Sequence, residues 1–394
     1  MPEPSHYRHA CVLADCPRSA IRSNVALFVT LIIPHPSRAA SPALLCVVYN
    51  QRMKKQLALV FMALSILILV LIVRQEATPD TPPPSATIEP IRSAVQTLTF
   101  PTVDGVRYYK LYVPAAGAVG RPLVLYLHGG GQSFGLLENT AVGAALQDLA
   151  AEAQVVLVVP NGTDLETGSF YDPEDERGGI RNRQLWNDDR IDDQPKVELV
   201  DDVRFLTGLV DHLHEQLNTD RSRVYVLGPS NGGSMTQKVL LEEPERFAAG
   251  ASAIATVPAV YTDRKVQAPT PMLLWVSTED QWIDYAGNDQ GLSGQESIRW
   301  WATQNGHTGS RTMVPVSEPD AAGCYTTVQR FEGTAPVYGY VSHGGGHTLP
   351  SIDYRFPENF LVTELIGRQC ADIEALEVIW DFLLRFERTS SDGE

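Results

Sequence analysis

Short runs of β-branched and aromatic residues alternate with helical patterns along most of this chain, and this alternation limits the fold more than any other feature. The runs that predict strands are residues 107–113, 123–127, 155–159, 223–227, 272–276 and 337–341. The patterns that predict helices are residues 139–152, 199–217, 231–242, 296–304 and 373–383. A helix that connects neighbouring strands makes them parallel and covers one face of their sheet. We therefore expect an α/β fold with a mostly parallel sheet and helices on both faces.

Chain length and charge limit the number of domains and the partners. The 394 residues, of which 44% are hydrophobic, can bury the core of one large domain with additional segments. We place this domain at residues 92–394. The net charge is −16, and no cluster of lysines and arginines with interleaved aromatic residues offsets it. Such a surface repels phosphate backbones, so nucleic acid is not an expected partner.

An uncharged apolar run, LALVFMALSILILVLIV, occupies residues 57–73. It is long enough for a thin bilayer, and Lys54 and Lys55 before it predict that the N-terminus stays inside. We therefore expect membrane contact through residues 57–73 and an extracytoplasmic domain, either secreted or membrane-anchored. A cleaved signal peptide and an uncleaved anchor are both open. The anchor is favoured because the run is long for a signal peptide and no clear cleavage site comes after it.

The segments around this run support three further expectations. Residues 1–52 are rich in arginine and proline, whereas Met53 begins a sequence typical of an export signal. We interpret residues 1–52 as an over-extended translation start or a disordered N-terminus. Residues 53–76 are the expected signal peptide or signal-anchor helix. Residues 77–91 are proline-rich and predict an extended linker before the domain.

The cysteines and the acidic residues of the domain leave little room for a metal. Cys324 and Cys370 are the only cysteines after residue 92, and their spacing is not that of a zinc site. They can form a disulfide in an oxidising compartment or remain two small buried side chains. The polar stretch 161–197 contains a group of carboxylates that match no calcium loop, so we expect a solvated rim and neither metal nor other cofactor. These carboxylates are Asp188, Asp189, Asp192 and Asp193.

A G-x-S-x-G sequence occupies residues 228–232, directly between a predicted strand and a predicted helix. A serine nucleophile in an α/β sheet needs this context, because only small neighbours fit the sharp turn that exposes its hydroxyl. Ser230 is therefore the candidate nucleophile. The alternative is a serine that only caps an ordinary helix.

The serine requires a histidine base, which comes after it in the chain in this type of fold. His347 lies in a glycine-rich loop, SHGGGHT, after the predicted strand 337–341. Such a loop can carry an imidazole over the edge of the sheet. His343 is the second choice because it is close to the strand end, and His307 is interpreted as a surface or helix-capping residue.

The base in turn requires a carboxylate that orients it. The predicted strand 272–276 is followed by Ser-Thr-Glu-Asp, which places Asp280 at the carboxyl end of a strand, where α/β sheets collect their functional groups. Asp280 is the first choice, with Glu279 and Asp284 as alternatives.

A second glycine motif, His-Gly-Gly-Gly at residues 128–131, directly follows the predicted strand 123–127. Loops of this type bring backbone N–H groups to a developing oxyanion. The N–H groups of Gly130 and Asn231 are the predicted oxyanion hole, and the alternative is a plain glycine turn.

With these motifs, residues 95–388 resemble the secreted polyhydroxybutyrate depolymerase and feruloyl esterase-type family of α/β-hydrolases. The resemblance rests on LVLYLHGGGQS, VDDVRFL, RVYVLGPSNGGSM, PERFAAGASAIA, STEDQWIDYAG, GGGHTLP and IEALEVIWDFL, which begin at residues 123, 200, 223, 244, 277, 344 and 373. It implies an α/β-hydrolase fold with Ser230 as nucleophile, Asp280 as acid and His347 as base. Trp282, within the fifth motif, is assigned to substrate binding.

The sequence departs from the family pattern at three places. Pro229 precedes the serine, Val276 and Ser277 replace a common His-Gly pair, and Leu349 replaces a tryptophan. The last two adjoin the substrate cleft in such enzymes, so ester chemistry is better supported than any named polymer. The leading prediction is an extracytoplasmic serine esterase acting on a small or polymeric ester. The alternatives are a serine peptidase or acyltransferase with the same triad, and a non-catalytic surface-binding domain.

Overall fold

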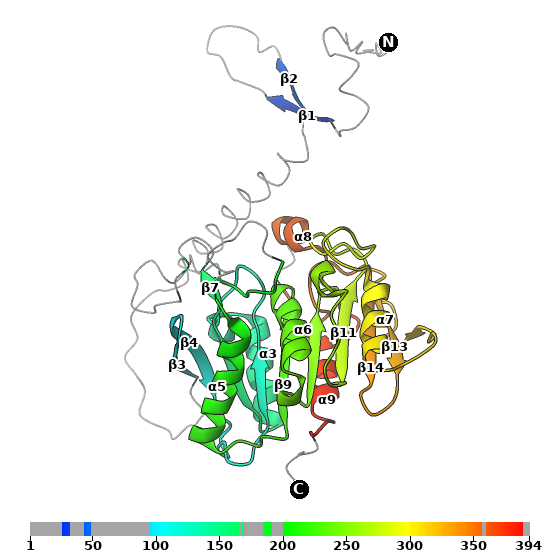
Figure 1. Cartoon of the computed structure of the whole chain (residues 1–394). Coiled ribbons are helices and arrows are strands. Elements are labelled where there is room, and N and C mark those ends of the chain that lie inside the picture. Colours follow the sequence, from blue (N-terminus) through cyan, green and yellow to red (C-terminus); the bar gives the residue numbers. More distant parts are fainter. Residues whose placement is uncertain are drawn as a thin grey trace, which may run out of the picture. The chain divides into compact units, whose positions relative to one another are not determined.

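The computed structural model divides the chain into two units, Met1–Asp80 and Thr81–Glu394, which are shown in Figure 1. The residues that it describes are 26–31, 43–48, 95–164, 168, 170, 184–190, 200–356 and 360–388. In the first unit β1 (Ala26–Leu31) and β2 (Ala43–Val48) pair as an antiparallel hairpin. The predicted membrane segment 57–73 and linker 77–91 lie outside the described residues. Among the described helices, none is both long and apolar enough to cross a membrane.

The second unit is built around a ten-stranded sheet in the order β12-β13-β14-β11-β10-β9-β5-β6-β4-β3. Its six central strands are parallel, and antiparallel strands complete both edges. The central strands are β5 (Leu123–Tyr126), β6 (Val156–Pro160), β9 (Val224–Pro229), β10 (Ala249–Ala253), β11 (Met272–Ser277) and β14 (Val337–His343). The edge strands are β3 (Gln96–Thr102), β4 (Gly105–Tyr112), β12 (Val314–Pro315) and β13 (Tyr325–Phe331). This arrangement confirms the predicted mostly parallel α/β fold.

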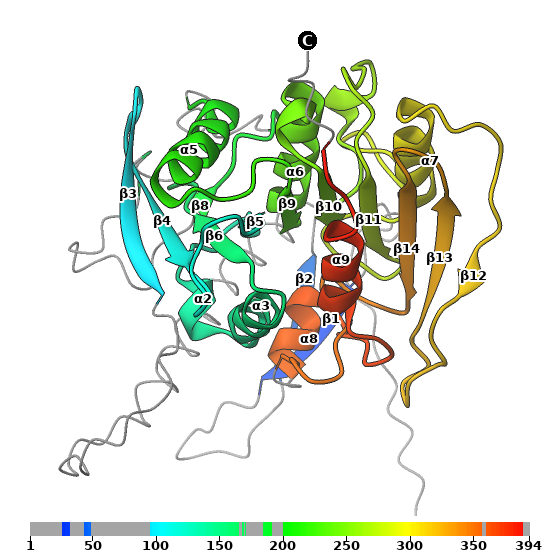
Figure 2. The same ribbon diagram turned by 90° about the horizontal axis from the view of Figure 1, so that it is seen from below.

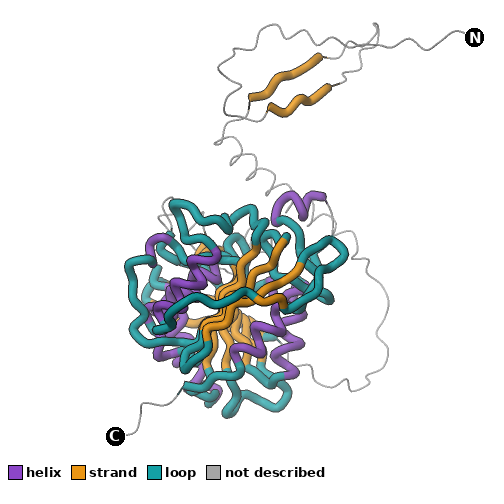
Figure 3. The backbone as a smooth tube through the Cα atoms, turned by 90° about the vertical axis from the view of Figure 1, so that its right-hand side faces the viewer, coloured by secondary structure: helices purple, strands orange, loops and turns teal. Residues whose placement is uncertain are grey.

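Helices cover both faces of this sheet (Figures 2 and 3). One face carries α5 (Asp202–Leu217), α6 (Asn231–Glu242) and α7 (Gly294–Gln304). The opposite face carries α3 (Ala141–Glu152) and α9 (Ala375–Leu383). Shorter elements occur in the connections: α2 (Leu136–Asn139), α8 (Phe360–Ile366), η1 (Pro244–Arg246), η2 (Ala259–Tyr261) and the small pair β7 (Thr163–Asp164) and β8 (Gln184–Leu185).

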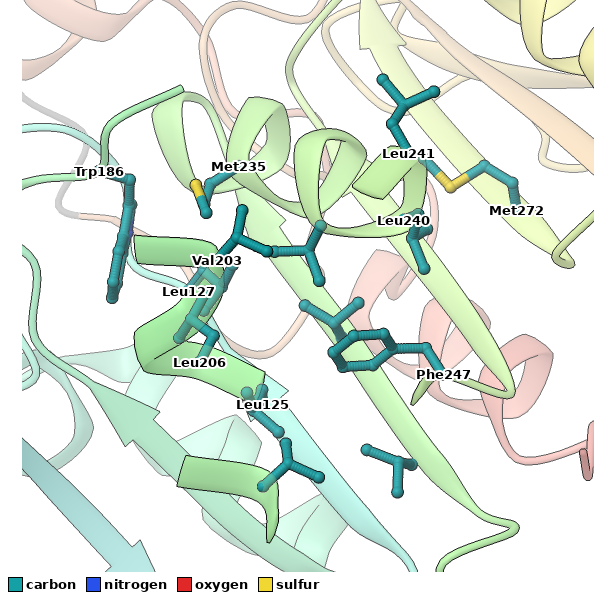
Figure 4. Close-up of a cluster of buried hydrophobic side chains, with 14 of the residues drawn as sticks. Leu125, Leu127, Trp186, Val203, Leu206, Met235, Leu240, Leu241, Phe247 and Met272 are labelled. Carbon is teal, nitrogen blue, oxygen red and sulfur yellow. The ribbon is translucent and has the colours of Figure 1, made fainter. Parts of the chain in front are cut away.

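Two hydrophobic cores lie between the sheet and its two helix layers, because alternate side chains of a strand point to opposite faces. On β5, Leu123 and Leu125 join the core under α5 and α6, whereas Val124 and Tyr126 join the core under α3 and α9. Figure 4 shows the first core, in which Leu125 lies among side chains of α5 and α6. Burying a leucine side chain contributes roughly 1.5–3 kcal/mol. These layers hold the carboxyl ends of the parallel strands in place.

Candidate active site

Ser230 lies in a sharp turn between β9 and α6 and has a left-handed backbone, with φ of 55° and ψ of −122°. This conformation costs a residue other than glycine on the order of 1–3 kcal/mol and is a mark of functional turns. The Ser230 N–H donates to Ala253 O at 2.8 Å, so the turn is tied to the neighbouring strand β10. The structure thus forms the strained turn that the G-x-S-x-G sequence predicts.

Only glycine fits two residues before and two residues after Ser230, because the chain at the end of β5 lies directly against both positions. A Cβ added at Gly228 would lie 2.5 Å from Leu127 O, and one added at Gly232 would lie 2.1 Å from the same oxygen. Carbon atoms do not approach a carbonyl oxygen this closely, so any side chain would push β5 away. The residue directly after this contact is His128, the first residue of the second glycine motif.

His347 and Asp280 meet at the carboxyl ends of β14 and β11. His347 Nδ1 lies 2.8 Å from Asp280 Oδ2 and 3.0 Å from Oδ1. The carboxylate also accepts the N–H groups of Trp282 and Ile283 at 2.8 and 2.9 Å. Its side chain is 2% exposed and that of His347 is 11% exposed. An ionised carboxylate can only accept hydrogen bonds, so the Nδ1 atom that faces it carries the proton of the imidazole. Nε2 of the neutral imidazole is then free to accept a proton.

The alternative candidates lie elsewhere. Glu279 and Asp284 are exposed, and Asp284 Oδ1 accepts the Ala286 N–H instead. The His343 imidazole stacks on Tyr325 with centroids 4.4 Å apart, and its Nε2 lies 2.9 Å from Thr327 Oγ1.

His307 likewise lies away from Asp280, and its Nε2 lies 2.8 Å from Ala335 O, beyond the end of α7. Of the candidates, the structure thus pairs only His347 with Asp280 among the residues that it describes.

Ser230 and His347 line the same cavity, which has a volume of about 230 Å³. Gly130 and Trp282 line it as well, so the cavity brings together side chains and loops from β5, β9, β11 and β14. The Trp282 indole stacks on the His347 ring with centroids 5.8 Å apart and is 51% exposed. Further lining comes from apolar side chains: Tyr126, Leu136, Val142, Pro229, Ile254, Leu349, Pro350, Tyr354, Phe356, Ile366 and Leu376.

The two predicted oxyanion donors are adjacent. A Cβ added at Gly130 would lie 3.4 Å from Asn231 Cβ. Neither backbone N–H donates to another residue in the described part of the chain. The Asn231 side chain is occupied, since its Oδ1 accepts the Trp186 N–H and its Nδ2 donates to Asp188 Oδ2 at 2.8 Å. Only the backbone of Asn231 is therefore available to a substrate oxygen.

The buried His128 side chain holds the glycine loop 128–131 in place through hydrogen bonds. Its Nε2 accepts the Gly162 N–H at 3.1 Å, so its Nδ1 is the donor, 2.9 Å from Gly129 O. Burial lowers the pKa of His128 to about 4, with a smaller contribution from the positive charge of Arg107. The imidazole is therefore neutral near pH 7. This supporting role was missed by sequence reasoning, although a histidine directly before the glycines was a signal for it.

The expected solvated rim of carboxylates is wrong for the two members that the structure describes. Asp188 is buried and accepts from Asn231 and from Arg190, whose Nη2 lies 2.6 Å from Asp188 Oδ2. Asp189 pairs with Lys238 at 2.7 Å and with Arg264 at 2.6 Å. Local polarity suggested solvent, but Asn231, Lys238 and Arg264 come from distant segments. Asp192 and Asp193 lie outside the described residues.

A wall of the cavity at residues 349–356 was also missed. Glu374 accepts the Ile352 N–H, the Asp353 N–H at 2.6 Å and the Ser351 hydroxyl at 2.8 Å. Gln369 accepts the Phe356 N–H at 2.7 Å and donates to Leu349 O at 3.0 Å. Two side chains near α9 thus fix a segment that lacks regular structure, and no local pattern marks such a contact.

The chain has several known relatives. A model of the prolyl oligopeptidase family matches residues 174–320, which contain Ser230 and Asp280. The putative esterase NocK of Nocardia uniformis subsp. tsuyamanensis is 27% identical over 75% of this chain and 84% of that protein. Feruloyl esterase B of Neurospora crassa is 24% identical over 62% of this chain and 84% of that protein.

Two further likenesses involve acetylxylan esterases. Acetylxylan esterase A of Emericella nidulans is 32% identical, but over 34% of this chain and 42% of that protein. The solved acetyl xylan esterase from Aspergillus awamori is 17% identical with a TM-score of 0.43, covering 65% of this chain and 94% of that one. The curated relatives and the arrangement of the sheet confirm the predicted enzyme class, a serine hydrolase with an α/β-hydrolase fold.

Proposed function

We propose that this serine hydrolase cleaves carboxylic esters outside the cytoplasm through an acyl-enzyme on Ser230. One observation carries the proposal: a strained serine and a histidine held by a buried carboxylate line one cavity, beside two backbone N–H groups that donate to no other described residue. The curated relatives NocK, acetylxylan esterase A and feruloyl esterase B are all named as esterases, which supports the ester bond as the bond that is cleaved.

The arrangement supports a two-step reaction. Ser230 Oγ attacks the ester carbonyl carbon while His347 Nε2 takes its proton, and Asp280 stabilises the imidazolium that forms. The carbonyl oxygen becomes an oxyanion between the N–H groups of Gly130 and Asn231. His347 then returns the proton to the leaving alcohol, and the acyl group remains on Ser230. Water attacks the acyl-enzyme with His347 again as base, which releases the acid and restores the serine.

The cavity supports an acyl or hydroxycinnamoyl group larger than acetyl. Its volume is about 230 Å³, and apolar side chains such as Leu136, Val142 and Leu349 form much of its lining. An apolar lining favours an apolar substrate group by about 25 cal/mol per Å² of surface removed from water. Trp282 offers a half-exposed aromatic face beside His347 for the remainder of the substrate.

Two features support the location outside the cytoplasm. The apolar run at residues 57–73 is preceded by basic residues, which favours export of the domain on its C-terminal side. Cys324 and Cys370 form a disulfide with their Cα atoms 5.5 Å apart, and structural disulfides persist in oxidising compartments.

A peptidase is the second candidate function, because the family model that matches residues 174–320 is that of the prolyl oligopeptidase family. The same serine, histidine and carboxylate can cleave an amide, with the proton going to the leaving amine instead of an alcohol.

A panel of substrates separates these functions. The full chain, purified in mild detergent, is assayed with p-nitrophenyl acetate and butyrate, methyl ferulate, a hydroxybutyrate oligomer and prolyl p-nitroanilide. We expect ester turnover, faster for butyrate or ferulate than for acetate. Ser230→Ala removes it, whereas Ser234→Ala serves as the matched control, because Ser234 lies in the adjoining helix α6 and its buried hydroxyl has no hydrogen-bond partner among the described residues. Turnover of the anilide alone, or full activity of Ser230→Ala, would contradict the proposal.

A further inference from the structure

His347 is carried by three consecutive glycines, Gly344 to Gly346, which give its backbone little intrinsic stiffness. The loop therefore depends on its neighbours for a fixed position. On one side the Glu279 N–H donates to Gly345 O at 3.0 Å, which links the loop to the turn that contains Asp280. The other side faces residues 365–370, which we call the 365–370 segment.

The 365–370 segment accepts hydrogen bonds from two backbone N–H groups of this loop. The His347 N–H donates to Ile366 O at 2.6 Å, and the Gly346 N–H donates to Arg368 O at 2.8 Å. The packing is close, since a Cβ added at Gly346 would lie 2.5 Å from Ile366 O and from Gly367 Cα. The segment also reaches the ring that stacks on His347, because Trp282 Nε1 donates to Leu365 O at 2.6 Å. It thus contacts both the backbone and the aromatic neighbour of the imidazole.

The Cys324–Cys370 disulfide joins the end of this segment to the start of β13. Strand β13 pairs with β14, the strand that leads into the glycine loop. Both sulfurs lie next to the loop: a Cβ added at Gly344 would lie 3.5 Å from Cys324 Sγ, and one added at Gly345 would lie 3.2 Å from Cys370 Sγ. The two cysteines are 0% and 1% exposed. The covalent link therefore fixes the 365–370 segment to the same sheet edge that carries His347.

We propose that the Cys324–Cys370 disulfide positions His347: it holds the 365–370 segment against the glycine loop and so keeps the imidazole at its working place beside Ser230. The inference rests on the proposed function of this site. Breaking the link lets the segment move away from the loop, which then keeps only its hydrogen bonds to the turn of Asp280, so that the imidazole loses its fixed position. The disulfide then affects the rate of the chemical steps more than the binding of substrate.

The test compares oxidised and disulfide-free forms of the full chain. The reference carries serine at Cys11, Cys16 and Cys46, so that the cysteines of the pair are the two that remain. In one arm dithiothreitol reduces the disulfide: the S–S bond becomes two S–H groups and the reagent closes to its own cyclic disulfide. In the other arm the reference carries Cys324→Ser and Cys370→Ser. Without the disulfide, Asp320 still connects the chain at residue 324 to the chain after residue 370, because it accepts the backbone N–H groups of residues 324 and 371 at 2.9 Å each.

Two readouts distinguish positioning from general stability. Kinetics with p-nitrophenyl butyrate should show kcat about 10- to 100-fold lower and KM little changed, since small displacements of a catalytic group have costs of this size. The downfield proton resonance of His347 Nδ1–H, bonded to Asp280, should broaden or vanish, and it requires no substrate. Leu125→Ala is the matched control, because it lowers stability in the core without touching the loop.

Gly367→Ala tests the same contact with the disulfide intact. Gly367 has φ of 77°, and its added Cβ would lie 2.6 Å from Gly346 Cα, so the variant should show the same loss of kcat. This variant also tests the proposal if the chain with Cys324→Ser and Cys370→Ser does not fold. The proposal is overturned if the disulfide-free enzyme keeps kcat within about 2-fold with its resonance intact, or if Gly367→Ala is fully active. If the oxidised reference cleaves no ester, the proposed function fails, while the resonance still tests the disulfide.

Discussion

Replacing Asp280 with asparagine tests the role of the carboxylate without changing its shape. Oδ1 of Asp280 accepts the N–H groups of Trp282 and Ile283 at 2.8 and 2.9 Å. The amide oxygen of an asparagine is therefore held at this position, and its NH₂ group takes the place of Oδ2, 2.8 Å from His347 Nδ1. An NH₂ group only donates, so the imidazole must present an unprotonated Nδ1 and carry its proton on Nε2. In this form His347 cannot accept the proton of Ser230.

The expected loss in kcat is about 10⁴-fold, the effect of the equivalent change in serine proteases, which corresponds to about 5.5 kcal/mol of transition-state stabilisation. The assay is hydrolysis of p-nitrophenyl butyrate, with burst titration to count active sites. Glu279→Gln and Asp284→Asn are matched controls, because both carboxylates are exposed and nearby. If Asp280→Asn keeps more than about a tenth of kcat, or if a control loses as much, the assignment of the carboxylate is refuted.

The packing and the charges lead to four further predictions. Gly232→Ala should abolish folding or activity, because its Cβ would lie 2.1 Å from Leu127 O, and circular dichroism with an activity assay distinguishes the two outcomes. Leu125→Ala, fully buried in the core, should lower the free energy of unfolding by about 2–5 kcal/mol in urea titrations and leave kcat unchanged. Burial lowers the pKa of His128 from 6.5 to about 4, so the neutral imidazole stabilises the fold fully above pH 6.5. The free energy of unfolding should therefore fall by roughly 3 kcal/mol as the pH drops from 6.5 toward 4. Unfolding free energies that stay constant from pH 7 to 4 would contradict this. Trp282→Ala should raise KM for methyl ferulate more than for p-nitrophenyl acetate, since the exposed indole face lies at the cavity.

The central strands and their helices were predictable because each has a strong local signal. Strands β5 and β6 are unbroken runs of buried residues, nearly all of them leucine or valine, and α5 has one apolar stripe. Strand β10 was missed because its sequence, AGASA, contains none of the β-branched or aromatic residues that mark strands. Its small residues serve packing instead: a Cβ at Gly250 would lie 2.5 Å from Leu240 Cδ1. A requirement of this kind comes from the partner helix and not from the strand's own pattern.

The candidate site was predictable to the extent that it is made of strand ends. Ser230, Asp280 and His347 each come after a recognisable strand, and the parallel sheet brings these ends together at one edge. The disulfide stayed an open alternative because its formation depends on the separation of two Cα atoms, which spacing along the chain does not give. The burial of Asp188 was mispredicted for the same kind of reason, since its partner Asn231 is distant in sequence.

The acyl-enzyme on Ser230 is the central claim, and its covalent capture tests the claim most directly. The full chain is treated with a fluorophosphonate and, separately, with a slowly turned-over p-nitrophenyl ester at low pH, then digested and analysed by mass spectrometry. We predict one equivalent of adduct on the peptide that contains Ser230, lost in Ser230→Ala and retained in Ser234→Ala. An adduct on any other residue, or none while the enzyme turns over ester, would contradict the account.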